Sequence, residues 1–242
     1  YKAGKLNAAQ SQFHQRRPAE QLFDVEADPH EINNLSENPK YAKVLSQLRE
    51  GMKKKLRQIN DLSFYPESHM VKAALGNGQA YGKKYDGEID RLADISDLAL
   101  VPFTEAKSGL TKAMASENPW ERYWGCITAA VHGKAAKALV PNARELLGDK
   151  NLMVRMRAAE FLGSIKAMDP MPALLSVLNN ATTEQELMLT FNAVVYLRDY
   201  KGYKFDNSKL DLKFKAGEVV RRTSYLEGAP RRPSRKKPNK KK

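Results

Sequence analysis

The chain has 242 residues, of which 42% are hydrophobic and 29% charged, and its formal net charge is +13. This length allows one large domain or two small ones with a sizeable core. No apolar stretch approaches the roughly 18 residues that span a bilayer, which excludes a transmembrane segment within these residues. A single cysteine, Cys126, excludes an internal disulfide and a multi-cysteine zinc site.

Most of the positive charge lies at the end of the chain. Residues 230–242, PRRPSRKKPNKKK, carry eight Lys or Arg and no acid, and without them 33 basic residues face 28 acidic ones. Such a run has no large apolar side chains to bury. We therefore expect residues 229–242 to form a disordered basic tail, solvated rather than folded.

The first elements expected are a strand, a turn and a helix. QLFDV (residues 21–25) alternates apolar and polar side chains, as a half-buried strand does. Asp28 and Pro29 suit a turn in which the aspartate caps backbone amides. Asn38 followed by Pro39 is typical of a helix start, with asparagine at the cap.

The helix that follows is amphipathic. Its apolar residues repeat at three and four positions over about six turns. They are Tyr41, Val44, Leu45, Leu48, Met52, Leu56 and Ile59. We expect the opposite face, with Lys53, Lys54, Lys55 and Arg57, to be solvated.

This part of the chain resembles a known family. Residues 17–50, with residues 1–13 before them, resemble the carboxy-terminal subdomain of the sulfatases, which often reads E-L-Y-D-L, then D-P-x-E-x-x-N-L and a long helix. The residues that match the turn are Asp28, Pro29, Glu31, Asn34 and Leu35. The resemblance implies that residues 1–60 are a small α+β remnant of that subdomain: strand, turn and long helix.

Residues 61–86 have no clear periodicity. GNGQAYGKKYDG within them is rich in glycine and polar residues, and we expect a linker loop. No apolar strand precedes the glycines and the G-x-G-x-x-G spacing fails at its third glycine, so a nucleotide-binding loop is not favoured.

From residue 87 to residue 205 helical patterns recur with a period of 33, which places Asn118, Asn151 and Glu184 in register. Asn118 with Glu121, and Thr183 with Glu186, have the spacing of capping boxes. These positions predict the starts of three first helices.

Second helices are expected in two of these repeats, within KALVPNARELL (residues 137–147) and PMPALLSVLNN (residues 170–180). Paired helices of this kind bury their apolar faces by stacking, so the sequence predicts an α-solenoid of about three helix pairs. NLMVRMRAAEFLGSI (residues 151–165) resembles the first helix of a HEAT repeat, in which the arginine, here Arg155, usually braces neighbouring repeats. Residues 206–228 are expected to be a C-terminal extension.

The sulfatase resemblance also implies a chemistry. These hydrolases use a formylglycine made from Cys or Ser in C/S-x-P-x-R, with calcium held by acidic and amide side chains. Cys126 lies in CITAA, which lacks both the proline and the arginine, and no serine supplies the pattern. We expect Cys126 to pack in the core. Calcium and formylglycine are accordingly expected in an N-terminal core that this chain lacks.

The remaining polar candidates do not form a site in the sequence. His14, His30, His69 and His132 are scattered, without metal-ligand spacing. His30 is expected to be exposed, and His14 is a candidate for approaching the cleft of a complete enzyme. The acidic residues of the turn do not have EF-hand spacing, and turn capping explains them. They are Asp24, Glu26, Asp28 and Glu31. No residue is assigned a catalytic, cofactor-binding or metal-binding role.

The resulting functional hypothesis is the C-terminal fragment of a bacterial sulfatase with appended HEAT-like repeats, inactive alone. Its partner would be the N-terminal sulfatase core, its substrate a sulfated small molecule or polysaccharide, and its compartment the periplasm or outside, all by family resemblance. The alternative is a self-standing HEAT-like adaptor that binds an anionic polymer or protein partner. The repeat region mixes charge signs and shows no continuous basic groove, so nucleic acid is not favoured.

Overall fold

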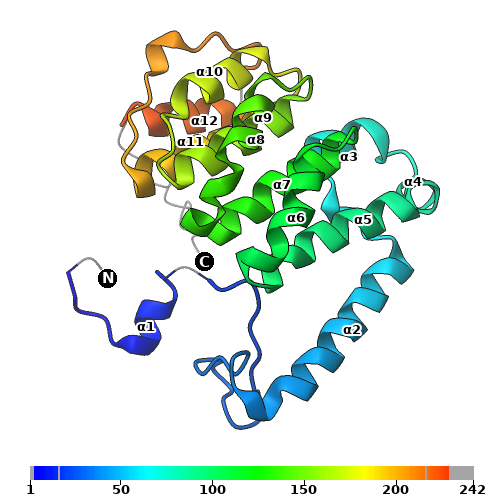
Figure 1. Ribbon diagram of the computed structural model, residues 1–242. Helices are drawn as coiled ribbons and strands as arrows, with labels where there is room; N and C mark the ends of the chain where they lie inside the picture. The colour runs from blue at the N-terminus through cyan, green and yellow to red at the C-terminus, as the bar shows by residue number, and fades with distance from the viewer. Residues whose placement is uncertain (1–2, 16, 216, 229–242) are drawn as a thin grey trace, which may run out of the picture. The chain divides into compact units, whose positions relative to one another are not determined.

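The computed structural model describes residues 3–15, 17–215 and 217–228, and within them the chain is mainly helical (Figure 1). The described residues contain no strand, and the predicted mainly α class is confirmed. The predicted basic tail, residues 229–242, lies outside the described residues. The chain divides into two compact units, residues 1–136 and 137–242.

In the first unit, α7 packs against both α5 and α6, while α2 lies along α5. Leu92 of α5, Leu110 of α6 and Cys126 of α7 are fully buried and form part of its core. The α-helices of this unit are α1 (Ala8–Gln12), α2 (Ala42–Ile59), α3 (Glu67–Ala73), α4 (Gly78–Lys84), α5 (Asp86–Asp97), α6 (Phe103–Met114) and α7 (Pro119–His132). Three short 3-10 turns belong to it as well: η1 (Pro39–Tyr41), η2 (Leu62–Phe64) and η3 (Leu98–Leu100).

In the second unit, α9 is the central helix and packs against α8, α10 and α11, and α12 packs against α11. Phe161, Leu174 and Phe191 are fully buried in this core. The helices are α8 (Val140–Glu145), α9 (Leu152–Ser164), α10 (Met171–Asn180), α11 (Glu184–Lys201) and α12 (Gly217–Leu226), with η5 (Leu146–Gly148) and η6 (Asn207–Lys209) between them. Another 3-10 turn, η4 (Gly133–Leu139), covers the boundary between the units.

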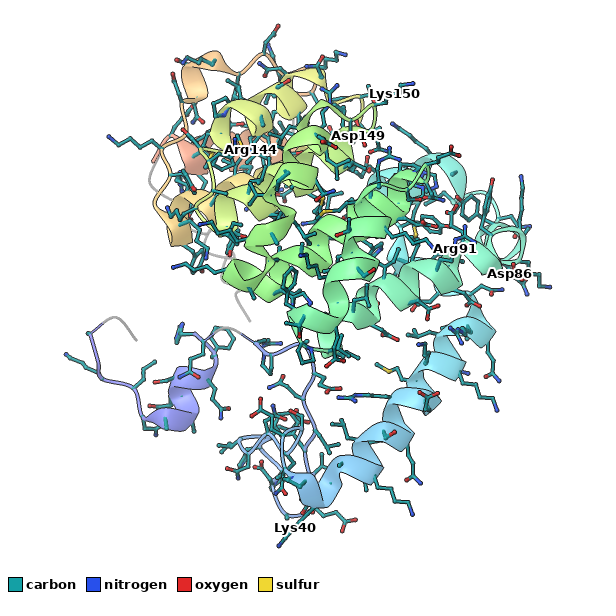
Figure 2. The ribbon with its side chains drawn as sticks, viewed as in Figure 1. Lys40, Asp86, Arg91, Arg144, Asp149 and Lys150 are labelled. Carbon is teal, nitrogen blue, oxygen red and sulfur yellow. The ribbon has the colours of Figure 1, made fainter. Side chains whose placement is uncertain are left out.

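The repeated helices begin where the capping residues predict. Asn118 Oδ1 accepts a hydrogen bond from the amide of Trp120 at 2.8 Å, and Asn151 Oδ1 accepts one from the amide of Met153 at 2.9 Å. At α11 the cap is Thr183, one residue before the 33-residue register, and its capping box is complete. The box expected at Asn118 is not complete, because the amide of Asn118 donates to Ser116 Oγ at 3.1 Å and the carboxylate of Glu121 binds Arg91 of α5 (Figure 2).

Two arginines at equivalent positions of the 33-residue period, Arg122 and Arg155, form hydrogen bonds to the turns that precede their helices. Arg155 Nε donates to the carbonyl oxygen of Asp149 at 2.5 Å, and Arg122 Nη1 donates to that of Ser116 at 2.8 Å. Each arginine reaches back six residues, to a carbonyl at the end of the preceding helix pair. The predicted bracing role of Arg155 therefore takes the form of a hydrogen bond across the junction between one helix pair and the next.

The predicted strand at residues 21–25 is wrong. Leu22 donates its amide to Asn34 Oδ1 at 2.9 Å and accepts from the amide of Leu35 at 2.7 Å, so the following turn binds its backbone. A strand needs a neighbouring strand to pair with, and the described residues offer none. The turn itself is confirmed, because Asp28 Oδ2 accepts from the amide of Asn33 at 2.6 Å.

Residues 61–86 differ from the expected linker loop, because they contain η2, α3 and α4. Glycine is needed at one of these positions for close packing. A Cβ on Gly82 would lie 3.0 Å from Cβ of Asn60 and 3.2 Å from its carbonyl oxygen. The segment therefore packs within the first unit, and Gly82 permits a close approach of α4 to the end of α2.

Candidate functional site

The four histidines do not come together. His14 and His30 are exposed, as expected for His30, and the position of His14 relative to a cleft stays a prediction. His132 Nε2 lies 3.0 Å from the carbonyl oxygen of Leu98 and is part of the first unit's packing. His69 belongs to an aromatic cluster described below. Within the described part of the chain, no group of three or more His, Cys, Asp or Glu side chains is placed to hold a metal ion.

Two of the four acidic residues of the turn, Asp24 and Asp28, bind backbone amides. Asp24 Oδ1 accepts from the amide of Ala27 at 3.2 Å, and Asp28 binds the amide of Asn33. These are the hydrogen bonds of turn capping, which is the role predicted for them. Calcium and formylglycine therefore stay proposals for a core outside this chain.

Cys126 is a packing residue. It is fully buried on α7 and its thiol forms no disulfide. A catalytic thiol needs access for its substrate and an environment that favours the thiolate. The prediction that Cys126 packs in the core is confirmed.

Residues from four segments of the first unit form an aromatic cluster, which consists of Tyr65, His69, Tyr81 and Trp120. The rings of His69 and Trp120 lie 4.5 Å apart between centroids, and His69 Nε2 lies 2.7 Å from the hydroxyl of Tyr81. Burial lowers the pKa of His69 and raises that of Tyr81. The cluster fixes η2, α3 and α4 against α7.

Glu88 of α5 holds the polar side of this aromatic cluster. The hydroxyl of Tyr65 donates to one carboxylate oxygen, and Asn118 Nδ2 donates to the other at 2.5 Å. Burial, with the hydrogen bond to Glu88, raises the pKa of Tyr65. Both oxygens are thus bound by neighbouring side chains, and the network ties the segments together. This cluster was not predicted from the sequence, although the frequent aromatic residues between positions 64 and 85 could have indicated it.

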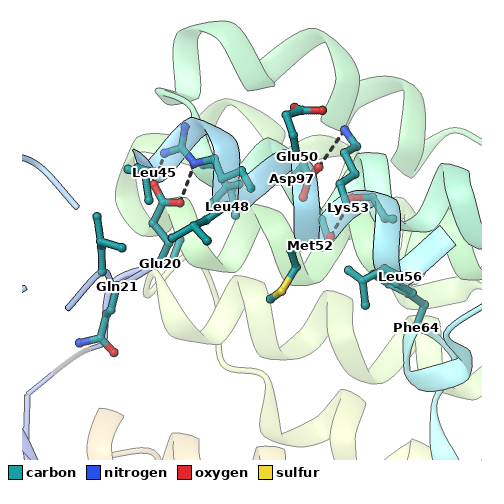
Figure 3. A pocket seen from close by; sticks show the side chains of 17 residues that line it. Glu20, Gln21, Leu45, Leu48, Glu50, Met52, Lys53, Leu56, Phe64 and Asp97 are labelled. Carbon is teal, nitrogen blue, oxygen red and sulfur yellow. Dashed lines mark hydrogen bonds and ion pairs between the residues drawn. The ribbon is translucent and has the colours of Figure 1, made fainter. Parts of the chain in front are cut away.

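A groove runs between α2 and α5 and has a volume of about 480 Å³ (Figure 3). Its floor is apolar, with Leu45, Leu56 and Phe64 among its lining, and its rim is charged. Further lining residues are Ala19, Glu20, Gln21, Leu22, Leu48, Arg49, Glu50, Met52, Lys53, Ala93, Ser96, Asp97, Ala99 and Leu100. The groove is thus lined on one side by the sulfatase-like segment, through residues 19–22 and α2. On the other side it is lined by α5, at the start of the repeat region.

Ion pairs along this groove join α2 to α5. Lys53 Nζ lies 3.1 Å from Asp94 Oδ1 and 3.0 Å from Asp97 Oδ2, and Arg57 Nε lies 3.4 Å from Asp90 Oδ1. Hydrogen bonds to Asp97 and then Asp94 raise the pKa of Lys53.

The solvated face predicted for α2 is confirmed for Lys54, Lys55 and Arg57, which are exposed, although Arg57 also pairs with α5. It is wrong for Lys53, which is half-buried against α5. Arg49 also pairs with Glu20, through Nε at 2.7 Å and through Nη2. This pair holds the segment before the turn on the same side of α2.

The apolar side of α2 remains largely uncovered. Of the predicted stripe only Leu45 is buried, and four others form what we call the α2 stripe: Val44, Leu48, Met52 and Ile59, which are 45%, 56%, 67% and 54% exposed. Large contiguous apolar surfaces are uncommon on monomers and mark contact sites. The α2 stripe, of which Leu48 and Met52 also line the groove, is the candidate functional surface.

Comparisons with known proteins gave one family match and one partial relative. Residues 107–187 match the family model of HEAT repeats. The predicted fold class, mainly α with HEAT-like helix pairs, is confirmed. Among curated proteins, an ulvan-active sulfatase of Formosa agariphila is 42% identical over 69 residues, which are 28% of this chain and 12% of that sulfatase.

The similarity to a sulfatase is therefore partial, and this chain spans a small part of that relative's length. No solved structure matches the chain. None of the helices in the described residues is long and apolar enough to cross a membrane.

Proposed function

We propose that this chain is the carboxy-terminal part of a sulfatase, in which it supports the catalytic core and does not itself hold the reacting groups. The observation that carries the proposal is the uncovered α2 stripe, which directly follows the sulfatase-like turn. The partial identity with an ulvan-active sulfatase supports it. Calcium, formylglycine and the sulfated substrate would then belong to the core, and the compartment would be the periplasm or the outside.

The occupant of the α2 stripe would be the sulfatase core of the same protein. Burying a side chain such as leucine or methionine contributes about 1.5–3 kcal/mol relative to leaving it exposed, so covering four of them would hold two parts of one protein together. Most of the length of the sulfatase relative lies outside the matched region, which leaves room for such a core.

The proposal is tested first by the coding sequence upstream of Tyr1. We expect it to contain a C/S-x-P-x-R motif and an early pair of aspartates. An upstream sequence without this motif contradicts the proposal.

The docking role is tested by co-expressing the upstream core and this chain as separate polypeptides and measuring co-purification. Leu48→Asp/Met52→Asp should abolish it, because charge would enter the apolar contact. The matched control, Leu75→Asp/Val220→Asp, also changes two exposed apolar residues, neither of which belongs to the α2 stripe, and should co-purify normally. Equal behaviour of the two double variants argues against docking through α2.

A further inference from the structure

A second surface lies in the other unit, where α11 and α12 pack side by side (Figure 1). Residues of both helices line an open cleft with a volume of about 380 Å³. Its lining combines tyrosines, arginines and carboxylates over an apolar base: Val195, Asp199, Tyr200, Glu218, Arg221, Arg222 and Tyr225. The proposed sulfatase role does not use this cleft.

Two tyrosines offer aromatic surface here. Tyr200 is 80% exposed, and its ring stacks on Tyr196 with centroids 6.2 Å apart and planes at 30°. Tyr225 is held in place, because its hydroxyl donates to Asp199 Oδ2 at 2.7 Å and the guanidinium of Arg198 lies 4.7 Å from its ring centroid. An exposed aromatic ring in a supported position offers a flat surface that suits a ligand with an apolar face.

The charges of the cleft are nearly balanced. Arg221 pairs with Glu218 at 2.8 Å, and the carboxylate of Asp199 is bound by Arg198 and Tyr225. Arg222 has no hydrogen-bond or ion-pair partner among the described residues. Its guanidinium therefore offers planar donors for one anionic group, such as a sulfate or a carboxylate.

We propose that this cleft binds an acidic saccharide, one that carries a sulfate or carboxylate on its ring. The C–H face of a sugar ring would stack on Tyr200, its acidic group would pair with Arg222, and Glu218 would accept hydrogen bonds from its hydroxyl groups. A nucleic acid fits less well, because closely spaced phosphates need a continuous basic track and would meet the carboxylates of Asp199 and Glu218. The inference stands on the cleft alone and does not depend on the proposed sulfatase role.

Calorimetric titration of the full chain with a chondroitin sulfate tetrasaccharide tests the inference. Tyr200→Ala and Arg222→Ala should each weaken binding by about fivefold to tenfold, the range of one aromatic or charge-assisted contact. The control is Arg144→Ala, which removes the same charge from an exposed position of the same unit and should leave binding unchanged. All three variants keep the basic tail, so its contribution is common to them.

The titration also separates stacking from general charge attraction. The effect of Tyr200→Ala should persist in about 0.3 M salt, because stacking is not screened whereas exposed charge pairs are. A tetrasaccharide that does not bind, or that binds the wild type and Tyr200→Ala alike, overturns the proposal. So does an oligothymidylate that binds more tightly than the saccharide and is insensitive to Tyr200→Ala, since the cleft would then play no part.

Discussion

Burial, rather than a neighbouring charge, governs the protonation of His69. The loss of water around the ring lowers its pKa, while the carboxylate of Glu88 acts in the opposite direction and is the smaller effect. The ring also stands against Trp120 and within hydrogen-bonding distance of Tyr81. A neutral imidazole is therefore part of the folded first unit.

This arrangement predicts a loss of stability in acid. Since the pKa of His69 is below its ordinary value of 6.5 in the folded state, the unfolded chain takes up the proton first as the pH falls. The stabilisation is complete above that value and is lost as the pH falls through the folded pKa. Thermal melts between about pH 7.5 and pH 5 should show a smaller decrease for His69→Phe than for the wild type. His30→Gln, at an exposed position, is the control, and an unchanged slope in His69→Phe would contradict the prediction.

Leu162 gives a test of the repeat core at a single position. It is fully buried in α9, as the 33-residue register predicts. Leu162→Ala should lower the free energy of unfolding by about 2–5 kcal/mol, because it leaves a cavity. Urea denaturation measures this, with Leu75→Ala, at a 76% exposed position, as the control. A loss below about 0.5 kcal/mol, typical of surface changes, would mean that the register is wrong.

At the scale of helices and turns, the sequence predicted the features that depend on nearby residues. Asn118, Asn151 and Thr183 cap their helices because a side-chain oxygen three or fewer residues away reaches a free amide. Tertiary contacts decided the others. The strand at residues 21–25 had no partner, and residues 61–86 became helical through contacts of rings and of Gly82 that no local pattern reveals.

Asn118 makes both kinds of contact, a local cap of α7 and a hydrogen bond to Glu88 of α5, and a substitution can remove one and keep the other. Asn118→Asp keeps the oxygen that caps α7 but replaces the donor to Glu88 by a second carboxylate. We expect a loss of about 1–3 kcal/mol at neutral pH, from the lost hydrogen bond and the like charges. Chemical denaturation measures the loss. Adding Glu88→Gln should restore part of the stability, and a double variant as unstable as the sum of the two single variants would refute the interaction.

Across the first unit, the predicted helix and turn were right but the surface they form was not foreseen. Periodicity placed Leu48 and Met52 on an apolar stripe, yet it does not say what covers a stripe. The ion pairs of Lys53 and Arg57 join residues 33 to 44 positions apart, which sequence periodicity does not reveal. The α2 stripe is therefore recognised as a candidate contact surface only once the structure shows that α5 leaves it largely exposed.

The last prediction concerns the activity of the chain as a whole. Cleavage of a sulfate ester needs a strong nucleophile and positive charge around the sulfate oxygens, placed to within about half an ångström. The sequence has no C/S-x-P-x-R motif, and Cys126 is fully buried. The purified chain should therefore hydrolyse neither aryl nor sugar sulfates, with or without calcium. An assay of released sulfate measures this, with Cys126→Ala beside the wild type. Turnover in the wild type that disappears in Cys126→Ala would place a nucleophile where the structure shows packing. It would contradict the proposal that the reacting groups belong to a separate catalytic core.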